Sequence, residues 1–312
     1  ISPLFPFQKK KEIWKKSLCK LQKEAKVIMI NPVLRRELKT KMRTWKAPTL
    51  LVIYLAILAV FGGLILSINE LESYTGGFDP GNALTIYFLL AGCQLGLIII
   101  LVPALTSGTI SGERERQTLD LLLITKLSPF SIIIGKLMAS ISQIILLILA
   151  SMPVFSIIFL FGGVSASNIL LLFFFFIATA VMVGSIGIFC STFFRKTTTA
   201  TVVSYLLILI LSIGTLVGLA LLNQYAYIVR QQGLTYGESL LIAGANPFVG
   251  FLSVIQNQAG YNIVSDILGV RNNISKIPFQ PWQVNMIFDA IITCIMIFFS
   301  VIRIRPVMRR RK

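Results

Sequence analysis

The chain has 312 residues, of which 55% are hydrophobic and only 13% are charged, and its mean hydropathy is +0.83. A water-soluble domain does not carry that balance, and the apolar runs are long enough to cross a membrane as helices, so the sequence predicts an all-α integral membrane protein. The chain has no histidine, and its four scattered cysteines form no CxxC pair, so we predict no metal site and no histidine-based catalysis.

Topology accounts for the net charge of +17. If both termini face the cytoplasm, 26 of the 29 Lys and Arg residues lie on the cytoplasmic side of the predicted spans, where short basic segments remain during insertion. This distribution predicts a multi-pass protein of the plasma membrane whose basic tails lie near anionic membrane lipids. It argues against a nucleic-acid partner.

The first 46 residues precede the first apolar run. Residues 1–28 are rich in lysine and are followed by Met29, and we predict that they are a poorly ordered extension or lie upstream of the natural start. Residues 29–46 are predicted to form an interfacial helix, because Asn31 and Pro32 make a favoured helix start. The apolar and basic residues that define the two sides of this helix are Leu34, Leu38 and Trp45, and Arg35 and Arg36.

Six apolar runs reach the roughly 20 residues that a helix needs to cross the hydrocarbon layer. They lie near 47–68, 83–107, 137–161, 168–189, 200–222 and 283–304. We therefore predict one six-span transmembrane domain over residues 47–312.

The segment 111–136, between the second and third spans, is charged and has helical periodicity. One helical face carries Glu113, Arg116, Gln117 and Asp120, and another carries Thr118, Leu119, Leu122 and Leu123. Residues three and four apart lie together on a helix, so this pattern predicts an amphipathic helix that lies on the membrane surface or docks into a groove of a partner. A solvated loop helix is the alternative.

The same segment contains the pattern E-[RK]-E-x-[GQ]-T-L-[DE]-x-L-L, followed by Ser-Pro and then by Gly-Lys at the start of a span. The matching residues are Glu113, Arg114, Glu115, Gln117, Thr118, Leu119, Asp120, Leu122, Leu123, Ser128, Pro129, Gly135 and Lys136. This pattern resembles the permease subunits of ATP-binding cassette (ABC) transporters of the ABC-2 type. Gln117 occupies a position that is often Gly in that family, and Lys126 one that is often Pro.

The resemblance implies that this segment is a cytoplasmic coupling helix that inserts into a separate ATPase, with the interfacial helix beside it. The residues expected to couple to the ATPase are Glu113, Arg114, Glu115, Arg116, Thr118, Leu119, Asp120 and Leu122. We expect Glu113 to pair with a basic residue of the partner and Leu119 to fill an apolar groove there.

The long segment 223–282 separates the fifth and sixth spans. Its apolar stretch 239–255 is interrupted by Asn246-Pro247. A stretch too apolar for a solvated loop and too broken for a clean span predicts two short re-entrant helices, which dip into the outer leaflet before the last span. In the resembled family such helices close the outer end of the pathway. A small external cap without membrane contact is the alternative.

Two glutamines and one acid lie inside the predicted spans, namely Gln94, Gln143 and Asp289. Asp289 is the one charged residue well inside a span, about 9 Å from its outer end by helix rise. A membrane-embedded acid is a functional candidate by default, but at that depth the side chain can also reach the outer headgroups or hydrogen-bond within the bundle. We expect Asp289 to be structural and the glutamines to join helices, with pathway lining as the alternative.

The sequence has no nucleotide-binding loop, because its one Gly-Lys pair, Gly135-Lys136, lacks the preceding glycine of a P-loop. We therefore predict that this subunit is not an enzyme and holds no cofactor, and that cytosolic ABC ATPase partners bind the ATP and Mg. The predicted function is the permease subunit of an ATP-driven exporter, in which a second permease, identical or related, completes the pathway. The alternatives are an ion-coupled secondary transporter, an intramembrane enzyme and a membrane anchor or scaffold.

Overall fold

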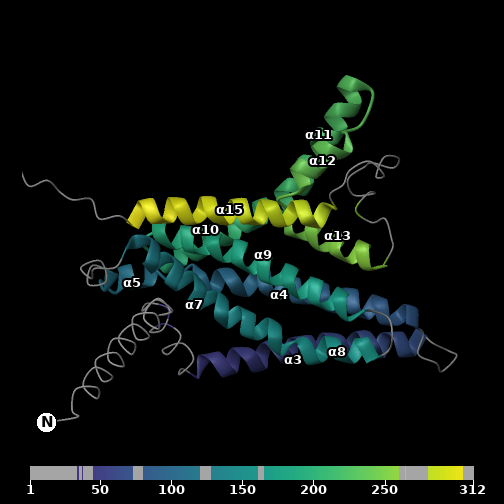
Figure 1. The fold of residues 1–312 in the computed structure, drawn as a ribbon, viewed down its shortest axis with the longest axis horizontal. Helices are drawn as coiled ribbons and strands as arrows, with labels where there is room; N and C mark the ends of the chain where they lie inside the picture. Colours follow the sequence, from purple (N-terminus) through teal and green to yellow (C-terminus); the bar gives the residue numbers. More distant parts are fainter. Residues whose placement is uncertain are drawn as a thin grey trace, which may run out of the picture.

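The computed structural model describes Leu34, Glu37, Val264 and residues 45–72, 80–119, 128–160, 165–259 and 280–304. Every regular element in those residues is a helix (Figure 1). In chain order the elements are α3 (Lys46–Glu72), α4 (Pro80–Thr106), α5 (Ser111–Glu115), α7 (Pro129–Ala150), α8 (Met152–Leu160), α9 (Ala166–Phe193), α10 (Thr197–Leu209), the π-helical η1 (Ile210–Gly214), α11 (Thr215–Arg230), α12 (Tyr236–Ala243), α13 (Pro247–Ala259) and α15 (Pro281–Ile304).

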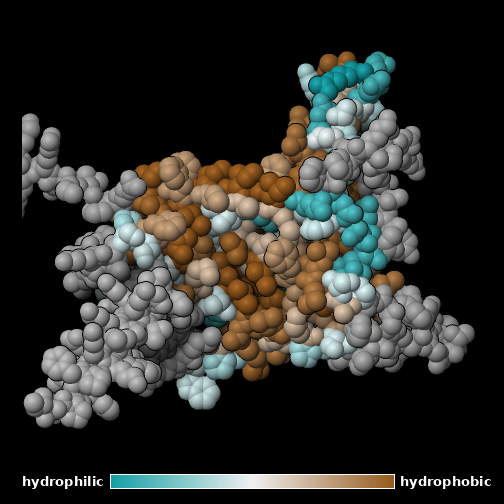
Figure 2. Space-filling model, viewed as in Figure 1, coloured by the Kyte–Doolittle hydropathy of each residue, from teal (hydrophilic) through white to brown (hydrophobic). Residues whose placement is uncertain are grey.

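The prediction of six spans is confirmed. Six helical stretches of the described residues are long and apolar enough to cross a membrane, and each contains or overlaps one predicted run. They are Ala47–Ile65, Leu84–Glu115, Pro129–Ser156, Ala166–Phe193, Thr197–Arg230 and Pro281–Ile304. Figure 2 shows apolar residues over the middle of the bundle and hydrophilic residues at the free end of α11 and α12, as expected for a body that crosses a bilayer.

The third span begins earlier than predicted. Helix α7 starts at Pro129 rather than near residue 137, because the Ser128 side chain accepts a hydrogen bond from the Ser131 N–H and proline suits the first helical position. The predicted span, near 137–161, starts directly after Lys136. In the structure Lys136 is buried within α7.

Helix α9 lies at the centre of the bundle. It is apolar on every side, which suits a helix surrounded by other helices, and it packs against α15, α4, α10 and α7. A small residue lets α4 approach closely, since a Cβ on Gly187 would collide with the side chain of Thr106 at the end of α4. This contact fixes the point at which the chain leaves α4 for the α4–α7 loop.

Helices α12 and α13 form the broken pair that was predicted before the last span. They are bent by 120° at residues 244–246, and Pro247 opens α13. The Asn246 side-chain amide donates to the Ser212 carbonyl (2.6 Å) and to Thr215 Oγ1 (2.7 Å). Ser212 lies in η1, so one carbonyl of this π-helical turn accepts its hydrogen bond from a residue outside its own helix. A side chain that bonds to a helix carbonyl in this way is a known cause of irregular helix geometry. The depth of the pair in the membrane stays a prediction.

Little of the predicted N-terminal organisation falls within the described residues. The extension 1–28 lies outside them, as do Arg35, Arg36 and Leu38 of the predicted interfacial helix. Leu34 and Glu37 are helical, and Trp45 is largely exposed directly before α3. The interfacial helix beyond these residues stays a prediction.

Candidate functional site

In the described residues of the α4–α7 loop, the predicted amphipathic helix is not continuous past Gln117. Its helix α5 covers only Ser111–Glu115 and ends in a turn at Gln117, whose φ is 56°. The Thr118 N–H donates to the Glu113 carbonyl (2.9 Å). The Gln117 N–H donates to the Arg114 carbonyl (3.1 Å), which completes a Schellman C-cap. The turn therefore ends the helical face on which Glu113 lies.

The left-handed φ of Gln117 explains why this position is often glycine in the resembled family. A residue with a Cβ in that conformation costs roughly 1 kcal/mol relative to glycine. We expect Gln117→Gly to raise the free energy of unfolding by about 0.5–1 kcal/mol, measured as a higher midpoint of thermal unfolding.

Two further variants test the geometry of that turn. Gln117→Val should lower the unfolding midpoint, because a β-branched side chain is especially strained at positive φ. Gln231, which follows α11 with a φ of 58°, offers a matched site where glycine should give a similar gain. An unchanged midpoint for Gln117→Gly alongside a gain for Gln231→Gly would contradict the turn at Gln117.

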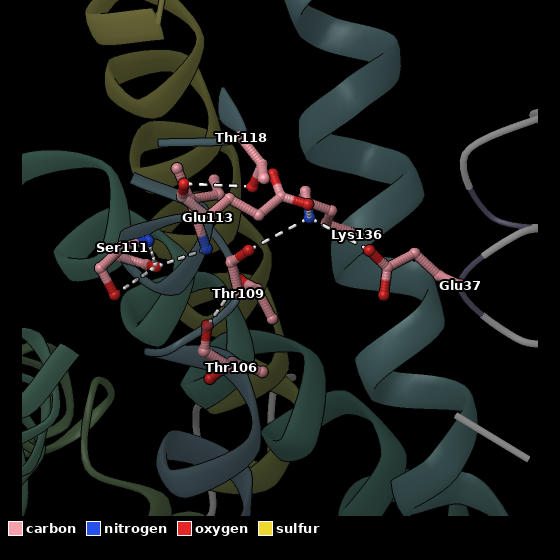
Figure 3. Close-up of polar contacts among 9 residues, drawn as sticks. Glu37, Thr106, Thr109, Ser111, Glu113, Thr118 and Lys136 are labelled. Carbon is pink, nitrogen blue, oxygen red and sulfur yellow. Dashed lines mark hydrogen bonds and ion pairs between the residues drawn. The ribbon is translucent and has the colours of Figure 1, made fainter. Parts of the chain in front are cut away.

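A buried lysine joins this loop to α7 and to the N-terminal segment (Figure 3). Lys136 is 2% exposed, and its Nζ donates to Glu113 Oε1 (2.7 Å) and to Glu37 Oε1 (3.1 Å). A third hydrogen bond goes to the Thr109 carbonyl (3.1 Å), so all three ammonium donors have an acceptor. A buried ammonium is tolerated where it is paired in this way, which explains how α7 contains a lysine. The expected pairing of Glu113 with a partner's basic residue is thus corrected, because Glu113 pairs within its own chain.

Leu119 also faces inward. It follows the turn, is 7% exposed and packs in an apolar cluster at the ends of α7, α9 and α15. The buried residues of this cluster are Ile110, Leu119, Ile133, Leu137, Ile141, Ile188 and Ile304. The expectation that Leu119 fills a groove on a partner is therefore wrong. Asp120 and Leu122 lie outside the described residues.

Glu115 ties α5 to the start of α10. Its carboxylate accepts hydrogen bonds from the Thr197 N–H (2.9 Å) and from the Thr197 hydroxyl (3.1 Å). Thr197 is the first residue of α10, and Lys196 before it provides no side-chain cap. Glu115 therefore satisfies an N–H group that a helix start leaves free, and its negative charge is favoured there by the helix dipole.

Small hydroxyl side chains hold the loop against α9 and α10. Ser191 of α9 accepts hydrogen bonds from the N–H groups of Ile110 and Ser111, both at 2.9 Å, and so caps α5 from another helix. Ser107, directly after α4, shares a hydrogen bond of 2.7 Å with Thr201 of α10. The loop is thus bonded to α7, α9 and α10, and a displacement of the loop involves all three.

A cavity of about 630 Å³ lies between this loop and the ends of α9 and α15. The described residues that line it are Arg114, Glu115, Gln117, Leu119, Phe193, Arg195, Lys196 and Arg303. Four of these residues are basic and one is acidic. The Arg303 guanidinium lies over the Phe193 ring, 5.4 Å from its centroid, as in a cation–π contact. The cavity is therefore positively charged, with an apolar wall.

The comparison with known protein families decides what kind of protein carries this site. The family model described as ABC-2 family transporter protein matches residues 31–303, which takes in the whole α4–α7 loop and reaches the last turn of α15. The chain belongs to the ABC-2 transporter family. It is a multi-pass transmembrane permease of an ABC transporter. No curated protein matched the chain.

In this ABC-2 permease, the other predicted coupling residues lie at or near the turn. Arg116 and Thr118 are exposed, and Arg114 is half-buried at the wall of the cavity. The Thr118 hydroxyl donates to the Glu113 carbonyl (3.2 Å), so it supports the turn. Contact of these residues with an ATPase stays a prediction.

The polar residues inside the spans of the permease differ in their surroundings. The Gln94 amide donates to Ser151 Oγ (2.9 Å) at the junction of α7 and α8, a contact of the helix-joining kind expected for it, and its role beyond this contact stays a prediction. Gln143 is half-buried, and its role stays a prediction. Asp289 is 2% exposed, and neither carboxylate oxygen has a hydrogen-bond partner in the part of the chain that the structure describes. The structural role expected for Asp289 stays a prediction.

The sequence interpretation gave Lys136 only as part of the family pattern and did not single out Glu37 or Ser191 as residues that contact the loop or its lysine. A usable signal exists for Lys136, because it lies inside an apolar run that opens with the helix start Ser128-Pro129. A lysine so far into a span needs a carboxylate partner. Nothing in the local sequence points to Glu37 or Ser191, whose contacts are distant in the chain.

Proposed function

We propose that this permease is the transmembrane subunit of an ATP-driven exporter of the plasma membrane, and that a separate cytosolic ABC ATPase drives it through the α4–α7 loop. The observation that carries the proposal is the set of contacts made by Lys136, Glu113 and Glu115, which bond the loop to α7 and α10. A force on a loop held in this way is transmitted to two spans, whereas a free loop would absorb it.

The contacts divide the loop into a tip and a base. Among the described residues of the loop, the exposed tip consists of Arg116, Gln117 and Thr118. The base, which is engaged within the chain, consists of Glu113, Glu115 and Leu119. We infer that the tip contacts the ATPase and that the base passes the displacement to the spans.

The charge distribution supports the orientation of the proposed exporter. Both termini and the α4–α7 loop face the cytoplasm, and α12 and α13 lie on the outer side. ATP and Mg²⁺ bind to the ATPase subunits, and this chain contributes no catalytic residue. ATP binding shifts the permease between inward- and outward-open conformations to the extent that the ATPase contacts the two conformations differently.

The fifth span offers a face for a second permease subunit. Helices α10 and α11 expose a series of large apolar side chains, namely Val202, Leu206, Leu209, Ile213, Val217 and Leu221. Inside a bilayer such side chains contact either lipid or another helix. This face supports a pair of permeases, identical or related, that enclose the pathway between them.

The coupling test changes the tip and spares the base. Arg116→Glu with Thr118→Asp should leave membrane abundance and the unfolding midpoint unchanged, because exposed substitutions usually alter stability by less than about 0.5 kcal/mol. We expect the variant to lose its co-purifying ATPase, or to show at least a tenfold lower rate of ATP hydrolysis by the reconstituted complex. Leu119→Ala is a poor probe, because it would open a cavity inside the permease itself.

A matched control lies at the far end of α11. Arg230 is exposed, and its ion pair with Glu238 is solvent-accessible, so Arg230→Gln should change neither the ATPase yield nor hydrolysis. Parental rates in the tip variant would contradict the proposal. Equal losses in both variants would also contradict it, because they would show that the effect is not specific to the tip.

An ion-coupled transporter is the competing function, and it would depend on Asp289. An ionised carboxylate buried without a partner is costly, so Asp289→Asn removes a charge at nearly constant shape. We expect ATP hydrolysis by the reconstituted complex to stay within about twofold of the parent, with an unchanged or higher unfolding midpoint. Lost transport at normal membrane abundance would instead favour ion coupling.

A further inference from the structure

The positively charged cavity has basic residues that form no ion pair within the part of the chain that the structure describes. Arg195, Lys196 and Arg303 are exposed, and none of them forms an ion pair with another described residue. Glu115, the one acid among the described lining residues, already accepts hydrogen bonds from Thr197. The cavity therefore has the charge to bind an anion.

An apolar stripe leads along α15 to this cavity. Ile291, Ile295 and Phe299 recur every four residues, so they lie on one side of the helix, and each is about half exposed. The next residue in that series is Arg303, which lines the cavity. A ligand that follows this surface meets apolar side chains over most of a span and then a group of cations at its end.

The cavity also lies at the level where a span meets the headgroups. Phe193 is the last residue of α9, Arg303 is in the last turn of α15, and Lys196 directly precedes α10. These positions are the ends of three of the six candidate spans. Basic residues at such positions, next to an exposed aromatic ring, are the usual protein side of an interface with anionic lipid.

We propose that this cavity binds the phosphate-bearing headgroup of an anionic phospholipid, with an acyl chain along the α15 stripe. A soluble anion would use the cavity alone, and a soluble protein partner would not reach the stripe within the bilayer; a phospholipid uses both. The bound phosphate would bridge Arg195 of the α9–α10 connection and Arg303 of α15 beside the α4–α7 loop. The lipid would thereby hold the last span against the coupling region.

The test uses the full chain purified in detergent, with phosphatidylglycerol and phosphatidylcholine as the two probes. We expect native mass spectrometry to retain one phosphatidylglycerol molecule and to release phosphatidylcholine, and phosphatidylglycerol alone to raise the unfolding midpoint. Arg195→Gln with Arg303→Gln should raise the dissociation constant for phosphatidylglycerol on the order of thirtyfold. Each basic residue near an anionic lipid lowers that constant by a factor of about five. Arg230→Gln, at the far end of α11, should bind like the parent.

Three outcomes would overturn the proposal. Equal binding of the two lipids would show that the charge of the cavity is not used. An equal rise in the midpoint with inorganic phosphate at the same concentration would show that the occupant is a free anion. Parental phosphatidylglycerol binding by the double variant, together with loss of the co-purifying ATPase, would assign the cavity to the protein partner. If the double variant fails to fold, Lys196→Gln, a single exposed substitution, should still weaken phosphatidylglycerol binding several-fold. Unchanged phosphatidylglycerol binding by Lys196→Gln would also contradict the proposal.

Discussion

Replacing Lys136 by methionine is expected to destabilise the permease by about 2–3 kcal/mol and to disconnect the α4–α7 loop from α7. The substitution keeps an apolar stem of similar length and removes the ammonium that pairs with Glu113 and Glu37. Breaking a buried ion pair by removing one partner costs about 3–5 kcal/mol, because the other charge is left without compensation. The two carboxylates are 26% and 24% exposed, so water offsets part of that cost. The measurements are the unfolding midpoint in detergent and ATP hydrolysis by the reconstituted complex.

A double-mutant cycle separates the ion pair from the packing of the lysine stem. Adding Glu113→Gln to Lys136→Met removes the closest uncompensated charge, so the double variant should recover about 1 kcal/mol or more relative to the sum of the single changes. Arg230→Met provides a control, because Arg230 is exposed and its ion pair with Glu238 is solvent-accessible, so methionine should be tolerated there within about 0.5 kcal/mol. Strictly additive effects would show that the distance of 2.7 Å between Lys136 Nζ and Glu113 Oε1 does not reflect an energetic coupling.

The spans could be predicted from the sequence because their length and apolarity are local properties. A helix that crosses the hydrocarbon layer needs about 20 apolar residues whatever it packs against. The apolar runs can therefore be identified without knowledge of the fold. The break between α12 and α13 was predictable for a similar reason. Asn246 and Pro247 each disfavour a continuous helix through their own side chains.

The end of α5 was not predictable from periodicity. Polar and apolar residues keep a helical spacing past Gln117, so the pattern alone indicates one helix, whereas the backbone turns there into the left-handed region. A glycine at that position would have marked the turn, and this chain has glutamine. The burial of Leu119 follows from the turn, because the chain reverses toward the cluster at the ends of α7, α9 and α15.

The environments of the two buried charges depend on contacts that are distant in the chain. Lys136 pairs with Glu113 and with Glu37, which lie 23 and 99 residues away, so no local window contains the three together. The depth of Asp289 along α15 follows from helix rise, but its burial depends on which helices cover that side of α15. The sequence places Asp289 in a span and Lys136 at the start of one, and only the packing decides whether each is paired.

Replacing Gly187 by alanine is expected to destabilise the permease about as much as replacing Lys136 by methionine. Here the loss comes from packing alone. A Cβ at this position would collide with Thr106 Oγ1 and would lie 3.0 Å from Thr106 Cβ and 3.4 Å from the Ser107 backbone nitrogen. Thr106 is buried and its hydroxyl is bonded to the Val102 carbonyl, so it has little room to move. Overpacking of this kind costs about 1–3 kcal/mol, and we expect Gly187→Ala to fall at the upper end, with Gly187→Val lost from the membrane fraction.

The accompanying variants identify the contact and connect it to function. Thr106→Ala removes the hydroxyl that collides, so combined with Gly187→Ala it should recover at least half of the lost stability. Gly96→Ala in α4, where a Cβ meets no atom within 4 Å, should be neutral or stabilise by up to about 1 kcal/mol through helix propensity. Equal unfolding midpoints for Gly187→Ala and Gly96→Ala would refute the close approach of α4 and α9. Because the α4–α7 loop starts where α4 meets Gly187, partial separation of these helices should lower ATP hydrolysis by the complex at temperatures at which the spans are still folded.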